Sequence, residues 1–224
     1  DKLEKQGMNA FVLDLRNNPG GLIDSAVSVC GEFLLPQTVV VTTEGRVASQ
    51  NAPPYRTPAR DGKPLRRYPM CVLINQGSAS GAELVAGALQ DLKRAIIVGT
   101  TSFGKGSVQT ILPMKNGAAM RLTTAKYYTP GHRTIHENGV EPNIVSALTS
   151  QDEARISQWR QNSATGEARS LDLAKLGDHQ LERATDVLKG LMVYQQFNAP
   201  PADAPAPAKP KDAKPIENII RKLK

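Results

Sequence analysis

Two short stretches of the sequence carry the residue types that nucleophilic catalysis needs. Residues 75–83, Asn-Gln-Gly-Ser-Ala-Ser-Gly-Ala-Glu, place Ser78 and Ser80 between an apolar run, Met70–Ile74, and the expected start of a helix. A turn of small residues at such a junction can present a hydroxyl beside the unpaired N–H groups of the helix. The alternative is an ordinary capped turn, because serine is a favoured N-cap residue.

A serine hydroxyl is a poor nucleophile until a base takes its proton. The chain has three histidines, and none stands in a segment that favours this role: His132, His136 and His179. The other candidate base is Lys105, between two glycines in the segment 101–109. A lysine acts as a base only when it is neutral, and burial among small and apolar groups favours the neutral form. We therefore expect Lys105 to be buried.

Metal and nucleotide sites are less well supported. His132 and His136 are four residues apart, but the turn residues before them argue against a helix, and no carboxylate or cysteine cluster joins them. Residues 99–106, Gly-Thr-Thr-Ser-Phe-Gly-Lys-Gly, nearly match a phosphate-binding loop. The hydroxyl that would hold Mg²⁺ is missing, however, and the residues that follow are typical of a strand instead of a helix. We expect neither a metal nor an organic cofactor.

Composition narrows the fold class. Hydrophobic residues make up 40% of the 224 residues and aromatic residues only 4%, so the core should be aliphatic, as in an α/β sheet. The net charge of +7 lies largely in the C-terminal tail. Nucleic-acid binding is not expected, because no basic face interleaved with aromatic residues is evident. Cys30 and Cys71 both lie in apolar segments, which favours buried thiols and leaves a disulfide open.

The order of the elements predicts a mainly parallel sheet with packed helices. The expected strands are 8–15, 38–44, 70–74, 95–98 and 139–145, with a hairpin of 107–113 and 118–128; the expected helices are 22–35 and 82–91. Strands and helices alternate from residue 8 to residue 98, which is typical of parallel pairing. Residues 1–7 should end a helix at Gly7, and residues 45–68 should form a long polar loop.

The character of the chain changes near residue 149. Residues 1–148 form the expected α/β core, and residues 149–198 form a helical extension with a polar helix at 151–160 and an amphipathic helix at 178–197. Residues 199–224 are a Pro/Ala/Lys-rich linker, which we expect to be disordered, and a short basic segment that is either a docking helix or a fraying tail. The sequence opens as the end of a helix, so we expect a fragment.

Three motifs, taken together, resemble one protein family. Asn-Pro-Gly-Gly ends at Gly21, Gly-Ser-Ala-Ser-Gly-Ala-Glu spans 77–83, and Ser-Phe-Gly-Lys-Gly-Ser-Val-Gln ends at Gln109. In this order they resemble the C-terminal processing peptidases, or tail-specific proteases, which are Ser/Lys-dyad serine proteases. The resemblance covers residues 8–145 almost continuously, and the region near 178–195 is similar to the part that follows the core in bacterial members. It implies a crotonase-like fold.

The resemblance also implies a role for each matched residue. Ser80 would be the nucleophile, Lys105 the general base, and Gln109 the residue that orients the lysine. The oxyanion hole would be the backbone N–H of Gly81 with one from Gly20 or Gly21, which fits the physics because a helix-start N–H and a glycine N–H can both face a developing negative charge. Gly81-Ala82 departs from the common Ala-Ser, but a small residue after the nucleophile preserves the N–H.

The resemblance implies protein or peptide substrates bound by their C-terminal ends, and a periplasmic, exported enzyme that acts on envelope proteins. It also allows a homo-oligomer formed through the C-terminal helices and an adaptor protein. Members carry a PDZ domain and the first part of the protease core before the region matched here. A truncated, non-catalytic scaffold or oligomerisation module is therefore the alternative function. An acyl-CoA enzyme with the same fold is disfavoured, because those enzymes use glycine N–H donors without a Ser/Lys dyad.

Overall fold

The computed structural model describes residues 1–47, 51–115, 117–164 and 176–198. It divides the chain into two compact units, Asp1–Met192 and Val193–Lys224. The expected linker and basic tail at 199–224 lie outside the described residues.

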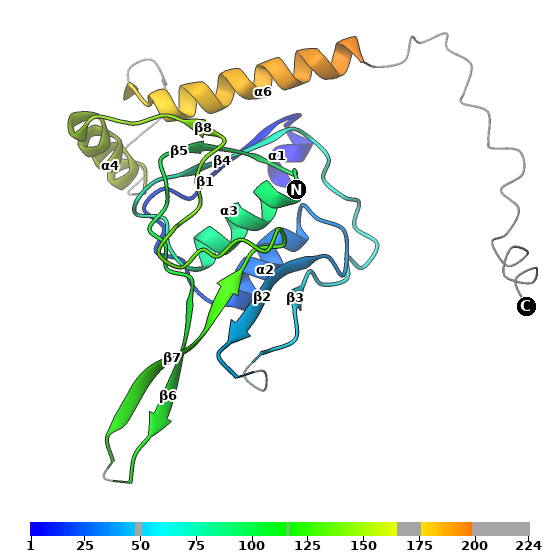
Figure 1. Cartoon of the computed structure of the whole chain (residues 1–224). Coiled ribbons are helices and arrows are strands. Elements are labelled where there is room, and N and C mark those ends of the chain that lie inside the picture. The colour runs from blue at the N-terminus through cyan, green and yellow to red at the C-terminus, as the bar shows by residue number, and fades with distance from the viewer. Residues whose placement is uncertain (48–50, 116, 165–175, 199–224) are drawn as a thin grey trace, which may run out of the picture. The chain divides into compact units, whose positions relative to one another are not determined.

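A parallel sheet forms the centre of the first unit (Figure 1). Its strands, in spatial order, are β1 (Phe11–Asp14), β4 (Met70–Ile74), β5 (Ile96–Gly99) and β8 (Ile144–Val145). All three pairings are parallel. Every residue of β4 is buried, which explains why its sequence is an uninterrupted apolar run without alternation.

A second, antiparallel sheet has the order β3-β2-β7-β6. Its strands are β2 (Val39–Gly45), β3 (Tyr55–Arg56), β6 (Ser107–Pro113) and β7 (Ala119–Tyr128). The predicted hairpin is confirmed as β6 and β7, which extend away from the parallel sheet in Figure 1. The strand expected at 38–44 is present as β2, but it belongs to this antiparallel sheet and not to the parallel one. β2 pairs with the C-terminal end of β7. β7 has ten residues, so it is long enough to pair with β6 along most of its length and with β2 at its end.

Helices cover both faces of the parallel sheet. α2 (Ile23–Gly31) and α3 (Gly81–Asp91) pack on one face, where Met70, Val72 and Ile74 join the main core. On the other face, Ala184 and Leu188 of α6 (His179–Phe197) pack against a smaller cluster. That cluster contains Cys71, Leu73 and Val98. Successive strand residues point to opposite faces, so β4 contributes to both clusters.

The remaining helices are short or polar. α1 (Lys2–Lys5) is followed by Gly7 with φ +88°, as expected for a helix that ends there. α4 (Ser150–Ala164) is the predicted polar helix, four residues longer than expected at its C-terminal end. Among the described helices, none is long and apolar enough to cross a membrane.

The two cysteines are free and buried. They belong to different clusters, Cys30 to the main core and Cys71 to the smaller one, so they are not paired. Burial raises the pKa of the Cys30 thiol to about 12 and that of Cys71 to about 11. Both thiols are therefore protonated and unreactive at neutral pH.

Candidate active site

Ser80 lies in a strained turn between β4 and α3. Its backbone has φ 53° and ψ −119°, a conformation that residues other than glycine rarely adopt. Such outliers persist only where the surrounding structure enforces them, and they cluster at functional sites. Ser80 is half-buried and is the N-cap of α3, so the N–H of Gly81, the first residue of the helix, follows directly.

Ser78 has a different environment from Ser80. Its side chain is fully buried, and its hydroxyl donates to the carbonyl of Leu15 at 2.7 Å. The same hydroxyl accepts from the backbone N–H of Asn75 at 3.0 Å. Ser78 therefore holds the turn against β1 and has no accessible hydroxyl, which supports Ser80 as the reactive serine of the two.

The glycine turn after β1 packs directly on the Ser80 turn. A Cβ at Gly20, where φ is +93°, would lie 2.5 Å from both the Ala79 oxygen and the Gly81 nitrogen. A Cβ at Gly81 would lie 3.2 Å from the nitrogen of Gly21. Only glycine permits this approach. The sequence prediction that these glycines meet at the serine is consistent with this packing.

The hydrogen bonds distinguish between Gly20 and Gly21 as the second amide of an oxyanion hole. The N–H of Gly20 donates to the side-chain oxygen of Asn18 at 2.9 Å. Within the described part of the chain, the N–H groups of Gly21 and Gly81 have no such partner. The pair Gly21 and Gly81 therefore fits an oxyanion hole better than a pair that includes Gly20.

A buried carboxylate, that of Glu83, joins the Ser80 turn to the Lys105 loop. Glu83 is 0% exposed, and one of its oxygens accepts from the backbone N–H of Ser80 at 2.8 Å and from that of Lys105 at 2.9 Å. Its other oxygen accepts from the Ser102 hydroxyl at 2.5 Å and from the N–H of Gly104 at 2.7 Å. Because Ser80 and Lys105 share one acceptor atom, their backbones are held side by side.

The expectation that Lys105 is buried is wrong for this structure: its side chain is exposed. The reason lies in its neighbours. Gly104 and Gly106 are both buried, and a Cβ at Gly106 would lie 2.4 Å from the nitrogen of His136. The loop thus turns its two glycines inward and, by alternation, the Lys105 side chain outward.

Gln109 is exposed on β6, at a register shift between β6 and β7. Its amide oxygen accepts from Arg121 on β7 across 3.5 Å, a long and weak contact. The structure therefore gives Gln109 a partner on the hairpin and does not bring its side chain to Lys105.

His136 contributes its backbone to the packing around Gly106, and the other two histidines have partners elsewhere. His132 stacks on Tyr128 and contacts the Glu44 carboxylate at 2.7 Å, and His179 lies 2.9 Å from Glu182. Within the described ranges, no group of three or more His, Cys, Asp or Glu is placed to hold a metal ion. The loop 99–106 leads into strand β6 and opens no helix, so it lacks the geometry of a phosphate-binding loop.

A small apolar cavity lies beside the glycines. It has a volume of about 170 Å³ and is lined by Gly20, Gly21 and Gly81 together with aliphatic side chains of β1, α2 and α3. Those include Leu13, Leu22, Val29, Ala82 and Val85. An apolar cavity of roughly this size accommodates a small hydrophobic group.

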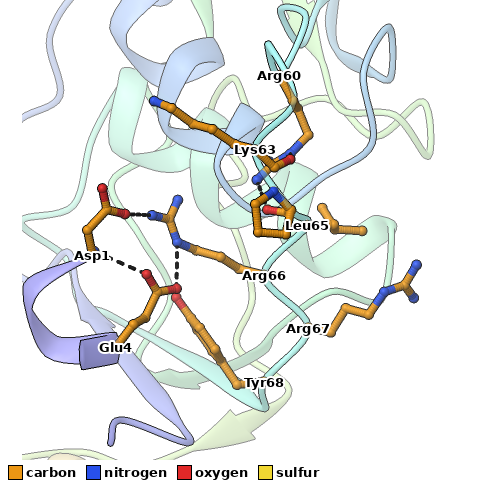
Figure 2. A pocket seen from close by; sticks show the side chains of 9 residues that line it. Asp1, Glu4, Arg60, Lys63, Leu65, Arg66, Arg67 and Tyr68 are labelled. Atoms are coloured by element: carbon orange, nitrogen blue, oxygen red, sulfur yellow. Dashed lines mark hydrogen bonds and ion pairs between the residues drawn. The ribbon is translucent and has the colours of Figure 1, made fainter. Parts of the chain in front are cut away.

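A larger cavity, of about 380 Å³, is lined by Asp1, Glu4 and residues of the segment 60–68 (Figure 2). Three of its charged residues are paired with one another: Arg66 lies between Asp1 and Glu4, at 2.7 and 2.9 Å. Arg66 also holds the pKa of Glu4 below its usual value. None of the predicted catalytic residues lines this cavity.

Sequence reasoning missed the residues that hold the site together. Glu83 could have been found, because Ser80-x-x-Glu83 has the spacing of a capping box. Ser102, Asn18 and the buried Arg16, described below, carry no local signal, since their partners are distant in the sequence.

The comparisons with known proteins agree on one family. Residues 1–146 match the model of peptidase family S41. The chain is 51% identical over 144 residues to a carboxy-terminal-processing protease of Bartonella bacilliformis and 41% identical to a carboxyl-terminal-processing protease of Synechocystis; each match covers 64% of this chain and 32% of the relative.

Among solved structures, the photosystem II D1 C-terminal processing protease is similar, with a TM-score of 0.58 and 35% identity. That match covers 65% of this chain and 36% of the other. The chain thus spans about a third of the length of the relatives it matches.

Proposed function

The chain belongs to peptidase family S41, and from this we propose that it carries the catalytic centre of a serine endopeptidase that cleaves proteins near their C-termini. The observation that supports this most strongly is the shared Glu83 oxygen, which keeps the strained Ser80 turn beside the Lys105 loop. The relatives' names supply the reaction class, and the packing of the glycine turn on the Ser80 turn supports Ser80 as the nucleophile.

In the proposed mechanism, the Ser80 hydroxyl attacks the carbonyl carbon of the scissile peptide bond while the unprotonated amine of Lys105 takes its proton. The amides of Gly21 and Gly81 donate hydrogen bonds to the tetrahedral oxyanion. Lys105 returns the proton to the leaving amine, and an acyl group remains on Ser80. Water, activated by the same amine, then hydrolyses this ester. No metal or organic cofactor enters these steps.

The exposed Lys105 must be brought to the Ser80 hydroxyl and kept neutral there. We propose that Gln109 orients the amine, in which case its amide must leave the 3.5 Å contact with Arg121. The apolar cavity beside the glycines is suited to a small aliphatic side chain of the substrate next to the scissile bond.

The exposure of Lys105 also favours a second candidate, a non-catalytic scaffold or oligomerisation module of the same family. In either case we propose that the whole protein is exported to the periplasm and acts on envelope proteins held by their C-terminal ends. Assembly through the C-terminal helices and recruitment of an adaptor protein belong to the same proposal. Nucleic acid is not a proposed partner.

The test is cleavage of an unfolded protein with an apolar C-terminus. It is run on this chain and on a longer form that includes the region preceding it in relatives. Cleavage should be lost in Ser80→Ala and Lys105→Met, while Lys126→Met, which removes an exposed lysine from β7, should retain it. If the folded longer form does not cleave, the scaffold takes the place of the enzyme.

A further inference from the structure

A buried arginine connects the helical extension to the glycine turn. Arg16 immediately precedes the Asn-Asn-Pro-Gly-Gly turn, yet it is only 6% exposed. Its guanidinium donates to both oxygens of Asp178, at 2.8 and 2.7 Å, and to the side-chain oxygen of Gln180 at 3.0 Å. Asp178 itself is 1% exposed. Two parallel bonds between a guanidinium and a carboxylate fix orientation as well as distance.

The extension contacts the stem of the turn at further points. Arg16 also binds Asp14 at the end of β1, and Arg160 of α4 pairs with the same Asp14 carboxylate. The side chain of Gln180 donates to the carbonyl of Ser146, after β8, at 2.6 Å. Two separate segments of the extension thus contact the end of the parallel sheet at which the glycine turn begins.

The turn has little freedom to move independently of Arg16. Leu15, the residue before Arg16, accepts a hydrogen bond from the buried Ser78 hydroxyl through its carbonyl. The carbonyl of Asn18, two residues after Arg16, accepts from the N–H of Ala79 at 2.9 Å. A displacement of Arg16 is therefore transmitted along the turn to Gly20, which leaves no space against the Ser80 turn, and to the adjacent Gly21. A misplacement of about 1 Å in a catalytic group can cost on the order of 100-fold in rate.

Docking of the extension does not require an ion pair. Ala184 and Leu188 of α6 already bury apolar surface against Cys71 and Leu73. Taking two charges out of water is costly, and an apolar pair of the same volume is often equally stable. The paired charges at Arg16 and Asp178 therefore supply a defined geometry that apolar packing alone does not.

We propose that the helical extension positions the oxyanion turn through the pair Arg16 and Asp178, so that these two are positioning residues for catalysis at Ser80. The proposal rests on the proposed function for its effect on turnover. The coupling of the extension to the turn is a property of the fold and is measurable without turnover.

The test uses the complete protein and the variant Asp178→Asn, which removes one charge with almost no change in shape. The matched control is Asp186→Asn, which removes an exposed carboxylate from α6, the helix that begins directly after Asp178; there Asp186 pairs with Lys189. Two quantities are measured well below the unfolding midpoint: kcat and KM for a peptide substrate, and amide hydrogen exchange of residues 15–22.

For Asp178→Asn we expect kcat to fall about 10- to 100-fold with KM within about twofold, because the turn serves the transition state more than substrate binding. Exchange at the hydrogen-bonded amides of Asn18 and Gly20 should accelerate at least about tenfold. The control should change neither quantity. Arg160→Gln changes a more exposed residue of the same network, and it should lower kcat and accelerate exchange by smaller factors. It replaces Asp178→Asn in the test if that variant does not fold.

The proposal is overturned if Asp178→Asn lowers the unfolding temperature but leaves kcat within twofold and exchange at 15–22 unchanged. That pattern would show a structural role only. If the wild-type protein has no Ser80-dependent turnover, the proposed function fails instead. Amide exchange then decides the coupling alone: faster exchange of the turn supports it, and unchanged exchange excludes it.

Discussion

Ser78 and Ser80 show how two residues of one type, two positions apart, take different roles. The hydroxyl of Ser78 is used internally, by Leu15 and Asn75, whereas Ser80 is half-buried on a strained backbone. The strain is maintained by Glu83, which accepts from the Ser80 N–H. The residue types in the Ser-Ala-Ser sequence do not distinguish the two serines, but their surroundings do.

Replacing these serines should therefore have opposite effects. Ser78→Ala leaves the Asn75 N–H without its acceptor and removes one of the two donors to the Leu15 carbonyl, so it should lower the free energy of unfolding by about 1–3 kcal/mol. Its kcat per folded molecule should stay within a few-fold of wild type. Ser80→Ala should leave stability nearly unchanged and reduce turnover by at least about 1,000-fold. Thermal unfolding and peptide cleavage, measured on the same samples, check the predictions for both variants. A Ser78→Ala variant that is stable but inactive would make Ser78, and not Ser80, the reactive serine.

The glycine turn offers a matched pair of substitutions. Gly20→Ala places a Cβ 2.5 Å from two backbone atoms at φ +93°, so we expect a loss of about 3 kcal/mol or more in unfolding free energy. Gly21→Ala meets nothing within 4 Å and should cost less than about 1 kcal/mol. Denaturant titration of both variants measures this difference. Equal costs would mean that the glycine turn does not pack on the serine turn as described.

At the scale of elements, Glu83 connects the first turn of α3 to the loop that follows β5. Its two oxygens accept from Ser80, Ser102, Gly104 and Lys105. A carboxylate at the third position of a helix is also favoured by the helix dipole. The relative placement of the proposed nucleophile and base thus depends on the Glu83 side chain, which bonds the backbones of Ser80 and Lys105 and not the Ser80 hydroxyl or the Lys105 amine.

Glu83→Gln is the sharpest substitution for this connection. A glutamine keeps the shape but presents an NH₂ group to donors that need an acceptor, so buried N–H groups lose their partners. We expect a loss of about 2–4 kcal/mol in unfolding free energy, and turnover that falls more than stability explains. Urea titration and kcat at low temperature separate the two effects. A variant of normal stability and activity would show that the connection is unimportant.

Much of the local structure follows from sequence patterns. β4 is recognisable as a continuous apolar run, α3 by its helical spacing, and the β6–β7 hairpin by Asn116-Gly117. The three turns of the candidate site stand at the expected positions in the strand order.

Pairings between distant segments are not encoded locally. β2 joins β7 instead of the parallel sheet, and Arg16 meets Asp178 across 162 positions. The outward direction of Lys105 also escapes sequence reasoning. It depends on Gly104 and Gly106 packing against residues 135–139, and no pattern near the lysine indicates this.

At the scale of the whole first unit, the ion pairs at the end of β1 make the free energy of unfolding depend on pH. Burial raises the pKa of Asp14, but the hydrogen bonds and positive charge of Arg16, with the charge of Arg160, outweigh this effect and hold that pKa below its usual value. A carboxylate with a lowered folded-state pKa stabilises the fold fully above its unfolded-state pKa. That contribution is lost as the pH falls through the folded-state pKa.

We therefore expect the unfolding temperature of wild type to decrease as the pH falls below about 4. Near pH 7, the unfolding free energy of Asp14→Asn should be lower than that of wild type by about 1 kcal/mol. On acidification, its unfolding free energy should decrease less than that of wild type. Unfolding curves at several pH values between 6 and 2 for both proteins test this. Parallel curves for the two proteins would mean that Asp14 makes no pH-dependent contribution.

The central claim is that Ser80 is the nucleophile of a serine endopeptidase. The most direct measurement is acid-quench mass spectrometry of the complete protein mixed with a peptide ester that has a small aliphatic residue before the ester. We predict one acyl group, mapped to Ser80, that forms before product release, is absent from Ser80→Ala, and forms at least about 100-fold more slowly in Lys105→Met. Hydrolysis that persists in Ser80→Ala, or an acyl group on another residue, would contradict the claim.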